Sequence, residues 1–162
     1  MPPTTPDLAR RASEVIAHLA QVDLWAPSLT SASIEDRSYL VEALASAPDE
    51  AHTYRIFSMR VGSRITGRLL LDEQTALLLE VEGIQRTGAQ LPPFVEPLHA
   101  LAQLHPLAVA AASAGSPPRM VWKYSAESTS RFRPFWLVQA NQQTFYIRVD
   151  GAVFTTLTNV DR

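Results

Sequence analysis

The sequence predicts an α+β protein made of two related units, each with helix followed by a three-stranded antiparallel sheet. The segment 68–83 is echoed by the segment 135–151. Their Gln-Thr pairs lie 69 positions apart and their acidic-Gly pairs lie 68 apart, so a one-residue gap aligns them. Helical periodicity precedes each segment, and the period changes to two within it. The predicted order is α-α-βββ-α-βββ, and the two units either share one core or fold separately.

The predicted boundaries follow from prolines and from the change of period. Residues 1–6 hold three prolines and are expected to form a flexible tail. The first unit is predicted over 7–87, a linker over 88–96 and the second unit over 97–162. A chain of 162 residues is long enough for one domain, or for two small halves that share a core.

Composition excludes several classes of protein. With 46% hydrophobic and 19% charged residues, the chain is expected to fold and not to be disordered. It has no cysteine, which excludes disulfides, thiolate catalysis and cysteine-based zinc sites. No run approaches the roughly 18–20 apolar residues that span a bilayer, so no membrane insertion is expected. The first residues lack the pattern of a secretory signal, and the predicted location is the cytoplasm.

Two helices are predicted at the start of the first unit. The first begins near Asp7, whose charge suits a helix N-terminus, and its apolar stripe comprises Leu8, Ala12, Val15, Ile16 and Leu19. The second begins at Ser31 or Ser33, because Ser33 and Asp36 resemble a capping box. Pro48 ends it, and its apolar side comprises Ile34, Leu40, Val41 and Leu44.

Three strands follow these helices. The ranges 54–61, 65–71 and 76–82 have a period of two, and 62–67 is expected to form a turn or a bulge. In the third strand, Glu80 and Glu82 are expected to point outward, and the side chains expected inward are Leu77, Leu79 and Val81.

The second unit is predicted to begin with a helix that has Pro97 in its first turn. Pro106 should kink or split this helix, because a mid-helix proline loses a hydrogen bond and clashes with the preceding turn. Gly115, which two prolines follow closely, ends it. Hairpin turns are expected at 140–142 and 150–151. The predicted strands are 120–124, 132–138 and 144–149, with a short fourth strand at 152–157.

Strand parity in the second unit gives a candidate binding surface. The side chains expected inside are Trp122, Trp136, Phe145, Ile147 and Val149. The opposite face then receives six cationic or aromatic side chains, namely Lys123, Arg131, Arg133, Phe135, Tyr146 and Arg148. Residues 116–162 also carry a net charge of +3, against −5 for residues 1–115. A second interpretation is a solvated face, or one half-covered by the first unit, whose Glu80 and Glu82 would pair with these arginines.

Two functions stay open on these grounds. The first is a non-catalytic module that contacts a protein partner through a sheet face or edge. A homodimer formed at an exposed sheet edge is one form of it. The alternative is a nucleic-acid-binding protein, in which the cations grip phosphates and the rings stack on bases. Salt separates the two, because phosphate contacts weaken steeply with ionic strength and an apolar interface hardly responds.

The sequence predicts no catalytic residue, no metal site and no cofactor. Residues 62–67 have the glycine spacing of a phosphate loop but lack the Lys-Ser/Thr that must follow it. No G-x-S-x-G motif is present. The histidines offer no pair at the spacing of a helical metal site, and they are His18, His52, His99 and His105.

The segments 133–138 and 145–153 resemble the closing hairpin of PepSY-type domains. Those small α+β modules carry a similar ending, "aromatic-x-V … Y-x-V-D-x-x-G-x-V". The resemblance covers about the last 30 residues and the repeated order of helix and strands. It implies a non-catalytic module that binds or restrains a protein, and it transfers no catalytic residue.

Overall fold

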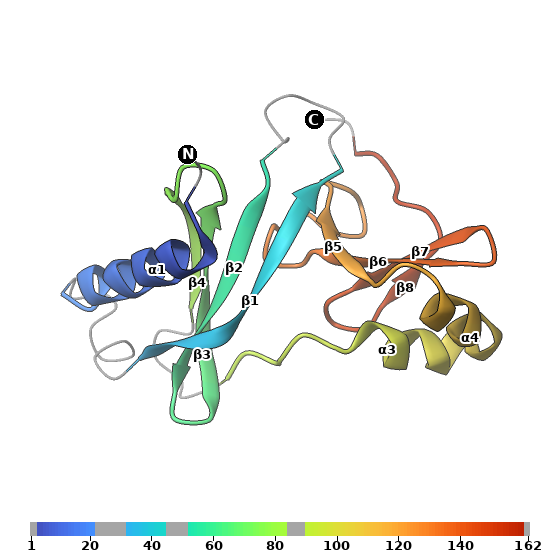
Figure 1. The fold of residues 1–162 in the computed structure, drawn as a ribbon, viewed down its shortest axis with the longest axis horizontal. Helices are drawn as coiled ribbons and strands as arrows, with labels where there is room; N and C mark the ends of the chain where they lie inside the picture. The colour runs from blue at the N-terminus through green and yellow to red at the C-terminus, as the bar shows by residue number, and fades with distance from the viewer. Residues whose placement is uncertain (1–2, 22–31, 45–51, 84–89, 161–162) are drawn as a thin grey trace. The chain divides into compact units, whose positions relative to one another are not determined.

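The computed structural model describes residues 3–21, 32–44, 52–83 and 90–160 (Figure 1). These residues contain three α-helices and eight strands, so the predicted α+β class is confirmed. The chain forms two compact units. Unit 1 comprises residues 1–40 and 52–93, and unit 2 comprises 41–51 and 94–162. No described helix is long and apolar enough to cross a membrane.

Unit 1 contains one described helix and a set of strands that are antiparallel where their pairing is given. Its strand order is β4-β3-β2-β1, with antiparallel pairing of β2 with β3 and of β3 with β4. The elements are α1 (Thr5–Leu19), β1 (Ser33–Ala43, in this unit up to Leu40), β2 (Tyr54–Val61), β3 (Arg64–Asp72) and β4 (Leu78–Gly83). Helix α1 packs on one face of the sheet, and the buried core there is Leu8, Ala12, Val15, Ile16, Phe57, Met59, Leu69 and Leu71.

Helix α1 has the predicted apolar stripe but begins before Asp7. Pro6 lies in its first turn, where a missing N–H costs nothing. The prediction that residues 1–6 all precede the helix is therefore wrong for Thr5 and Pro6. The Asp7 carboxylate accepts hydrogen bonds from the hydroxyl of Thr4 at 2.6 Å and from its backbone N–H at 3.1 Å. These bonds lower the pKa of Asp7 and fix the helix start.

The second predicted helix is wrong, because residues 33–43 form strand β1. Val41 is fully buried and pairs in parallel with Met120, a residue far away in the sequence. The apolar spacing in this segment suits a helix, but β-branched and aromatic residues such as Ile34 and Tyr39 also suit a strand. The long-range pairing with residues 120–122 favours the strand over the helix. The local sequence of 33–43 does not show this pairing.

The three strands predicted for unit 1 are confirmed. Gly62 turns the chain between β2 and β3 with a φ of 61°, a conformation that glycine adopts without strain. Gly67 lies inside β3, where an added Cβ would come within 2.6 Å of the carbonyl oxygen of Glu82. The missing side chain therefore allows β3 and β4 to approach each other.

Unit 2 contains two helices and a second set of strands. Its strand order is β1-β5-β6-β7-β8, and β5 to β8 pair antiparallel. The elements are α3 (Pro97–Leu104), α4 (Pro106–Ala114), β5 (Arg119–Trp122), β6 (Phe135–Ala140), β7 (Gln143–Arg148) and β8 (Val153–Phe154). The buried core beneath the helices is Ala100, Leu101, Ala108, Ala112, Val138, Ala140, Phe145 and Ile147.

The local signals predicted for unit 2 are confirmed. Pro97 stands in the first turn of α3, Pro106 separates α3 from α4, and Gly115 caps α4. Asn141 and Gln142 both have positive φ, at 51° and 64°, as a two-residue hairpin turn with the right twist requires.

The residue-by-residue repeat is not supported by the strands. Gln74 and Thr75 lie in the turn between β3 and β4, whereas Gln143 and Thr144 lie inside β7. The two pairs that aligned in sequence therefore occupy different places in their hairpins.

Candidate binding surfaces

The predicted surface in unit 2 has the expected parity. Phe135 lies opposite Arg148 and Leu137 lies opposite Tyr146, so these four side chains share one face. The neighbouring pair Trp136 and Ile147 belongs to the other face, where Ile147 packs beneath α3 and α4.

This face is not open to solvent at its centre, however. Phe135 is fully buried, and Leu137 and Val121 are buried beside it. Residues 152–160, which we call the C-terminal strap, supply Phe154 and Leu157 to this cluster. The prediction that Phe135 is available on a wet surface is therefore wrong. Strand parity shows which face a side chain lies on, but it contains no information about what covers that face.

Hydrogen bonds hold the strap in place. The backbone N–H of Thr158 donates to the Glu127 carboxylate at 2.9 Å, and the Ala126 N–H donates to the Thr158 carbonyl at 3.1 Å. Burial alone would raise the pKa of Glu127, but hydrogen bonds from Thr158, from the backbone of Glu127 and from Ser125 together lower the pKa. The strap is thus anchored at a carboxylate and at a backbone carbonyl.

Arg148 is half-buried and already engaged. Its guanidinium contacts the Asp150 carboxylate at 2.8 Å and donates a further hydrogen bond to the Glu127 carbonyl. The bond to Asp150 raises the pKa of Arg148, and the same bond lowers the pKa of Asp150. Tyr146 meets the Phe135 ring edge-on at 6.3 Å. Arg148 and Tyr146, which were predicted to contact a partner, therefore make these contacts within unit 2.

The remaining three predicted residues differ in their surroundings. Arg131 lies over the Trp122 ring at 5.5 Å, and the indole N–H of Trp122 donates to the Ser130 carbonyl at 3.0 Å. Arg133 is exposed and Lys123 is half-buried. The structure thus brings together Phe135, Tyr146 and Arg148, and it places Arg131 against Trp122.

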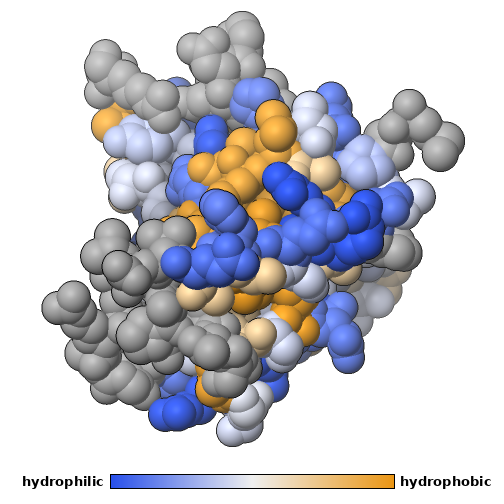
Figure 2. Space-filling model, turned by 90° about the vertical axis from the view of Figure 1, so that its left-hand side faces the viewer, coloured by the Kyte–Doolittle hydropathy of each residue, from blue (hydrophilic) through white to orange (hydrophobic). Residues whose placement is uncertain are grey.

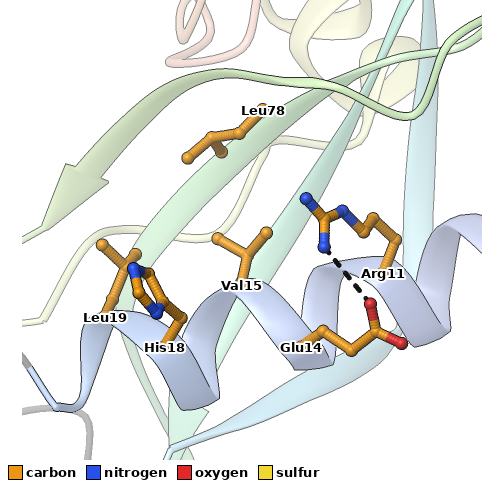
Figure 3. A pocket seen from close by; sticks show the side chains of 6 residues that line it. All are labelled: Arg11, Glu14, Val15, His18, Leu19 and Leu78. Carbon is orange, nitrogen blue, oxygen red and sulfur yellow. Dashed lines mark hydrogen bonds and ion pairs between the residues drawn. The ribbon is translucent and has the colours of Figure 1, made fainter.

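A second surface, which the sequence did not predict, lies in unit 1 between α1 and β4. It is a groove of about 380 Å³ lined by Arg11, Glu14, Val15, His18, Leu19 and Leu78. Figure 3 shows the aliphatic side chains of α1 directed toward Leu78, with Arg11 and Glu14 joined at the rim by an ion pair of 3.3 Å. Figure 2 faces the side of unit 1 that carries α1, and shows hydrophobic surface bordered by hydrophilic side chains.

A one-residue irregularity in β4 creates the apolar wall of this groove. Leu71 pairs with Leu78 and Leu70 pairs with Glu80, so the register shifts between them. Leu78 therefore lies opposite Leu71, which packs in the core beneath α1. The predicted inward position of Leu77 is wrong, since this side chain is 60% exposed. Alternation alone could not reveal the shift.

Strand β4 is also the outer strand of unit 1. Among the described strands it pairs only with β3. Each of its six residues is half-buried or exposed. Such a strand presents backbone N–H and C=O groups along its outer side. The groove therefore adjoins the edge of the sheet that the described strands form.

Asp72 fixes the turn that leads into β4. Its Oδ1 accepts hydrogen bonds from the backbone N–H of Gln74 and of Thr75, at 3.0 and 2.7 Å, and from the Thr75 hydroxyl at 2.8 Å. Its Oδ2 lies 3.5 Å from Nδ1 of His52. Burial alone would raise the pKa of Asp72, but these hydrogen bonds and His52 together lower it.

On the face of unit 1 away from α1, charged side chains form ion pairs. Arg60 contacts Glu35 at 2.8 Å, and the buried Arg68 contacts Glu82 at 3.6 Å. Arg68 also donates to the carbonyl of Pro92. Burial lowers the pKa of Arg68, and Glu82 opposes that shift. Among the described residues, no group of three or more histidine, aspartate or glutamate side chains is arranged to hold a metal ion.

Comparison with known proteins gave no matching family model, no similar curated protein and no similar solved structure. The resemblance of the C-terminal hairpin to PepSY-type domains therefore stays a prediction.

Proposed function

We propose that this protein is a non-catalytic binding module that receives an extended segment of a protein partner along β4. One observation carries the proposal: β4 ends the sheet formed by the described strands, and it borders an apolar groove on its α1 side. In strand addition, main-chain hydrogen bonds supply affinity, and a pocket for alternate side chains supplies specificity. The edge and the groove provide these two parts next to each other.

The size of the groove suits side chains of a bound peptide. Full burial of one aliphatic side chain stabilises a complex by roughly 1.5–3 kcal/mol. Val15, Leu19 and Leu78 supply apolar walls for such a side chain. Because β4 is six residues long, an added strand also gains several backbone hydrogen bonds.

A peptide-display selection on the immobilised full chain tests this function. Selected peptides should slow hydrogen exchange of β4 amides, because the added strand bonds to the edge. Leu78→Glu should abolish their binding by placing a charge in the groove wall. Leu107→Glu is the matched control, since Leu107 is 91% exposed on α4 of unit 2 and should leave binding unchanged. Exchange protection confined to unit 2 would contradict the proposal.

The nucleic-acid alternative has less support from the geometry. Base stacking needs an accessible ring, and Phe135 is fully buried. Arg148 is engaged by Asp150. We therefore place the binding function on β4 and not on the C-terminal sheet. Retention of single-stranded DNA or RNA that falls steeply with salt and is lost in Arg133→Ala would favour the alternative.

We also propose that the two units arose by duplication. The proposal concerns the arrangement of their helices and strands and not a residue-by-residue match. In each unit an antiparallel hairpin packs one face against helix. Leu69 and Leu71 do so in β3, and Val138 and Ala140 do so in β6. A related chain that contains a single unit would support a duplication.

A further inference from the structure

We propose that the C-terminal strap is a releasable cover, and that the sheet face beneath it binds a partner segment with an aromatic residue followed three positions later by an aliphatic one. The strap occupies this face with Phe154 and Leu157, and so shows which chemistry fits it. The face belongs to unit 2, whereas β4 belongs to unit 1. The inference therefore adds a second binding surface to the proposed function and does not rest on it.

The face beneath the strap has pairings and hydrogen bonds of its own. Val121 on β5 pairs with Phe135 on β6, and both side chains are fully buried. In the turn that follows β5, the hydroxyl of Ser128 donates to the carbonyl of Arg133 at 2.7 Å. These contacts join β5, β6 and the turn without residues of the strap. We therefore expect the receiving face to keep its shape when the strap leaves it.

The strap itself is held at few points. Each of its nine residues is half-buried or exposed. Strand β8 pairs with β7 at two positions, those of Val153 and Phe154. Further along, Thr158 donates to the Glu127 carboxylate and accepts from the Ala126 N–H. A segment with few buried contacts opens locally more easily than the core of its unit. The strap is therefore expected to open while β5, β6 and β7 stay folded.

The position of Phe154 favours an aromatic side chain. Its ring meets the Phe135 ring edge-on at 6.1 Å, and the Arg148 guanidinium lies 5.8 Å from the ring centre. Edge-on ring pairs and cation–π contacts are both attractive beyond the burial of apolar area. An aliphatic side chain at this position would lose both contacts.

The position of Leu157 favours an aliphatic side chain. Leu157 packs against the buried cluster that contains Phe135 and Leu137. An unpartnered polar group there would lose its hydration on burial. The two residues between Phe154 and Leu157 are exposed, so many side chains fit those positions. The pattern that fits the face is therefore aromatic-x-x-aliphatic.

A fluorescent peptide with the sequence of residues 152–160 tests the cover on the full chain. In the parent the strap competes with the peptide, so the apparent affinity falls with the fraction of chains that are open. Phe154→Ala weakens the strap, and by fluorescence polarisation this variant should bind the peptide at least about tenfold more tightly than the parent. A peptide of the same composition, with its phenylalanine and leucine adjacent, should bind both chains more weakly.

Two further variants show how the strap is held and where the peptide binds. Glu127→Gln removes the charge that holds Thr158, and it should raise the affinity of the full chain for the peptide about threefold. Leu78→Glu, introduced together with Phe154→Ala, should leave peptide binding unchanged, because Leu78 lines the groove of unit 1.

Three outcomes would overturn the inference. Equal peptide affinity of the parent and Phe154→Ala chains, with β6 amides of both protected from hydrogen exchange, would show that the face accepts no segment in place of the strap. Loss of β6 protection in Phe154→Ala would show that the strap is part of the folded core and not a cover. Loss of peptide binding in the chain that also carries Leu78→Glu would place the peptide at β4, which would support the proposed function instead.

Discussion

The outer strands of the two units differ in how they end a sheet. In unit 1, β4 has six residues and borders an apolar groove. In unit 2, β8 has two residues and belongs to the C-terminal strap, which bonds back to Ala126 and Glu127. Very short edge strands and covering loops are the usual protection against unwanted pairing. Unit 2 has the first of these, since β8 has two residues, whereas β4 has six.

Both outer hairpins depend on an aspartate, but to different degrees. Asp72 is 7% exposed and accepts three hydrogen bonds in the turn before β4. Asp150, in the turn before β8, is exposed and pairs mainly with Arg148. The accessible edge is thus preceded by a rigid turn. Rigidity there suits a site that must present its strand in one geometry.

The largest expected effect comes from Phe135→Ala, because Phe135 forms the centre of the strap-covered face. Loss of a fully buried phenylalanine costs about 3–5 kcal/mol of unfolding free energy. Chemical denaturation monitored by tryptophan fluorescence measures it. A cost below about 1 kcal/mol, as for an exposed residue, would show that the face is open as the sequence predicted.

Phe154→Ala should remove the contact between strap and sheet. Phe154 is half-buried and meets the Phe135 ring edge-on at 6.1 Å, so about 2 kcal/mol is expected. Hydrogen exchange of β7 amides should accelerate, because loosening β8 exposes its partner strand. Unchanged β7 exchange would mean that the strap does not protect this edge, and the contrast with β4 would then disappear.

Local signals made much of the fold predictable. Alternation in 54–61 and the prolines at 97 and 106 act within a few residues, and each gave the observed element. Strand β1 was missed because its pairing with β5 is non-local. Its own residues suit a helix as well as a strand. The contact that favours the strand is with β5, which lies too far away in the sequence for a local pattern to indicate it.

The binding surfaces were harder to predict than the elements. Parity placed Phe135 and Arg148 on one face correctly, but the strap that covers Phe135 comes from a later segment. The groove depends on the register shift that brings Leu78 opposite Leu71. A one-residue slip exchanges the two faces of a strand, so alternation predicts a face only where the register is regular.

Asp72→Ala should cost about 1–2 kcal/mol, since it removes the charged acceptor of the Gln74 and Thr75 backbone N–H groups. The turn before β4 should loosen, and peptide affinity at the groove should fall while unit 2 keeps its exchange protection. Asp36→Ala, a change of the same type at an exposed position of β1, is the control. Equal costs for the two variants would show that the Asp72 turn has no special role.

The smallest effect is expected from Asp150→Asn, and its size depends on pH. Arg148 lowers the pKa of Asp150 below its ordinary value of 3.8, so the folded state favours the carboxylate. The resulting stability is fully present above that ordinary value and is lost as pH falls through the lower, folded value. Because the Asp150 side chain is 46% exposed, solvent limits the contribution to below about 1 kcal/mol.

Unfolding free energies of the parent and Asp150→Asn chains, measured from pH 7 down to acid, check this. The parent should be slightly more stable at neutral pH, and the difference should vanish once Asp150 is protonated. Asp72 also has a lowered pKa, so both chains lose stability in acid and only their difference reports on Asp150. A difference that stays constant into acid would mean that the Asp150 charge does not stabilise the β8 edge. Protection of that edge would then rest on the apolar contacts of Phe154 and on the hydrogen bonds of the strap.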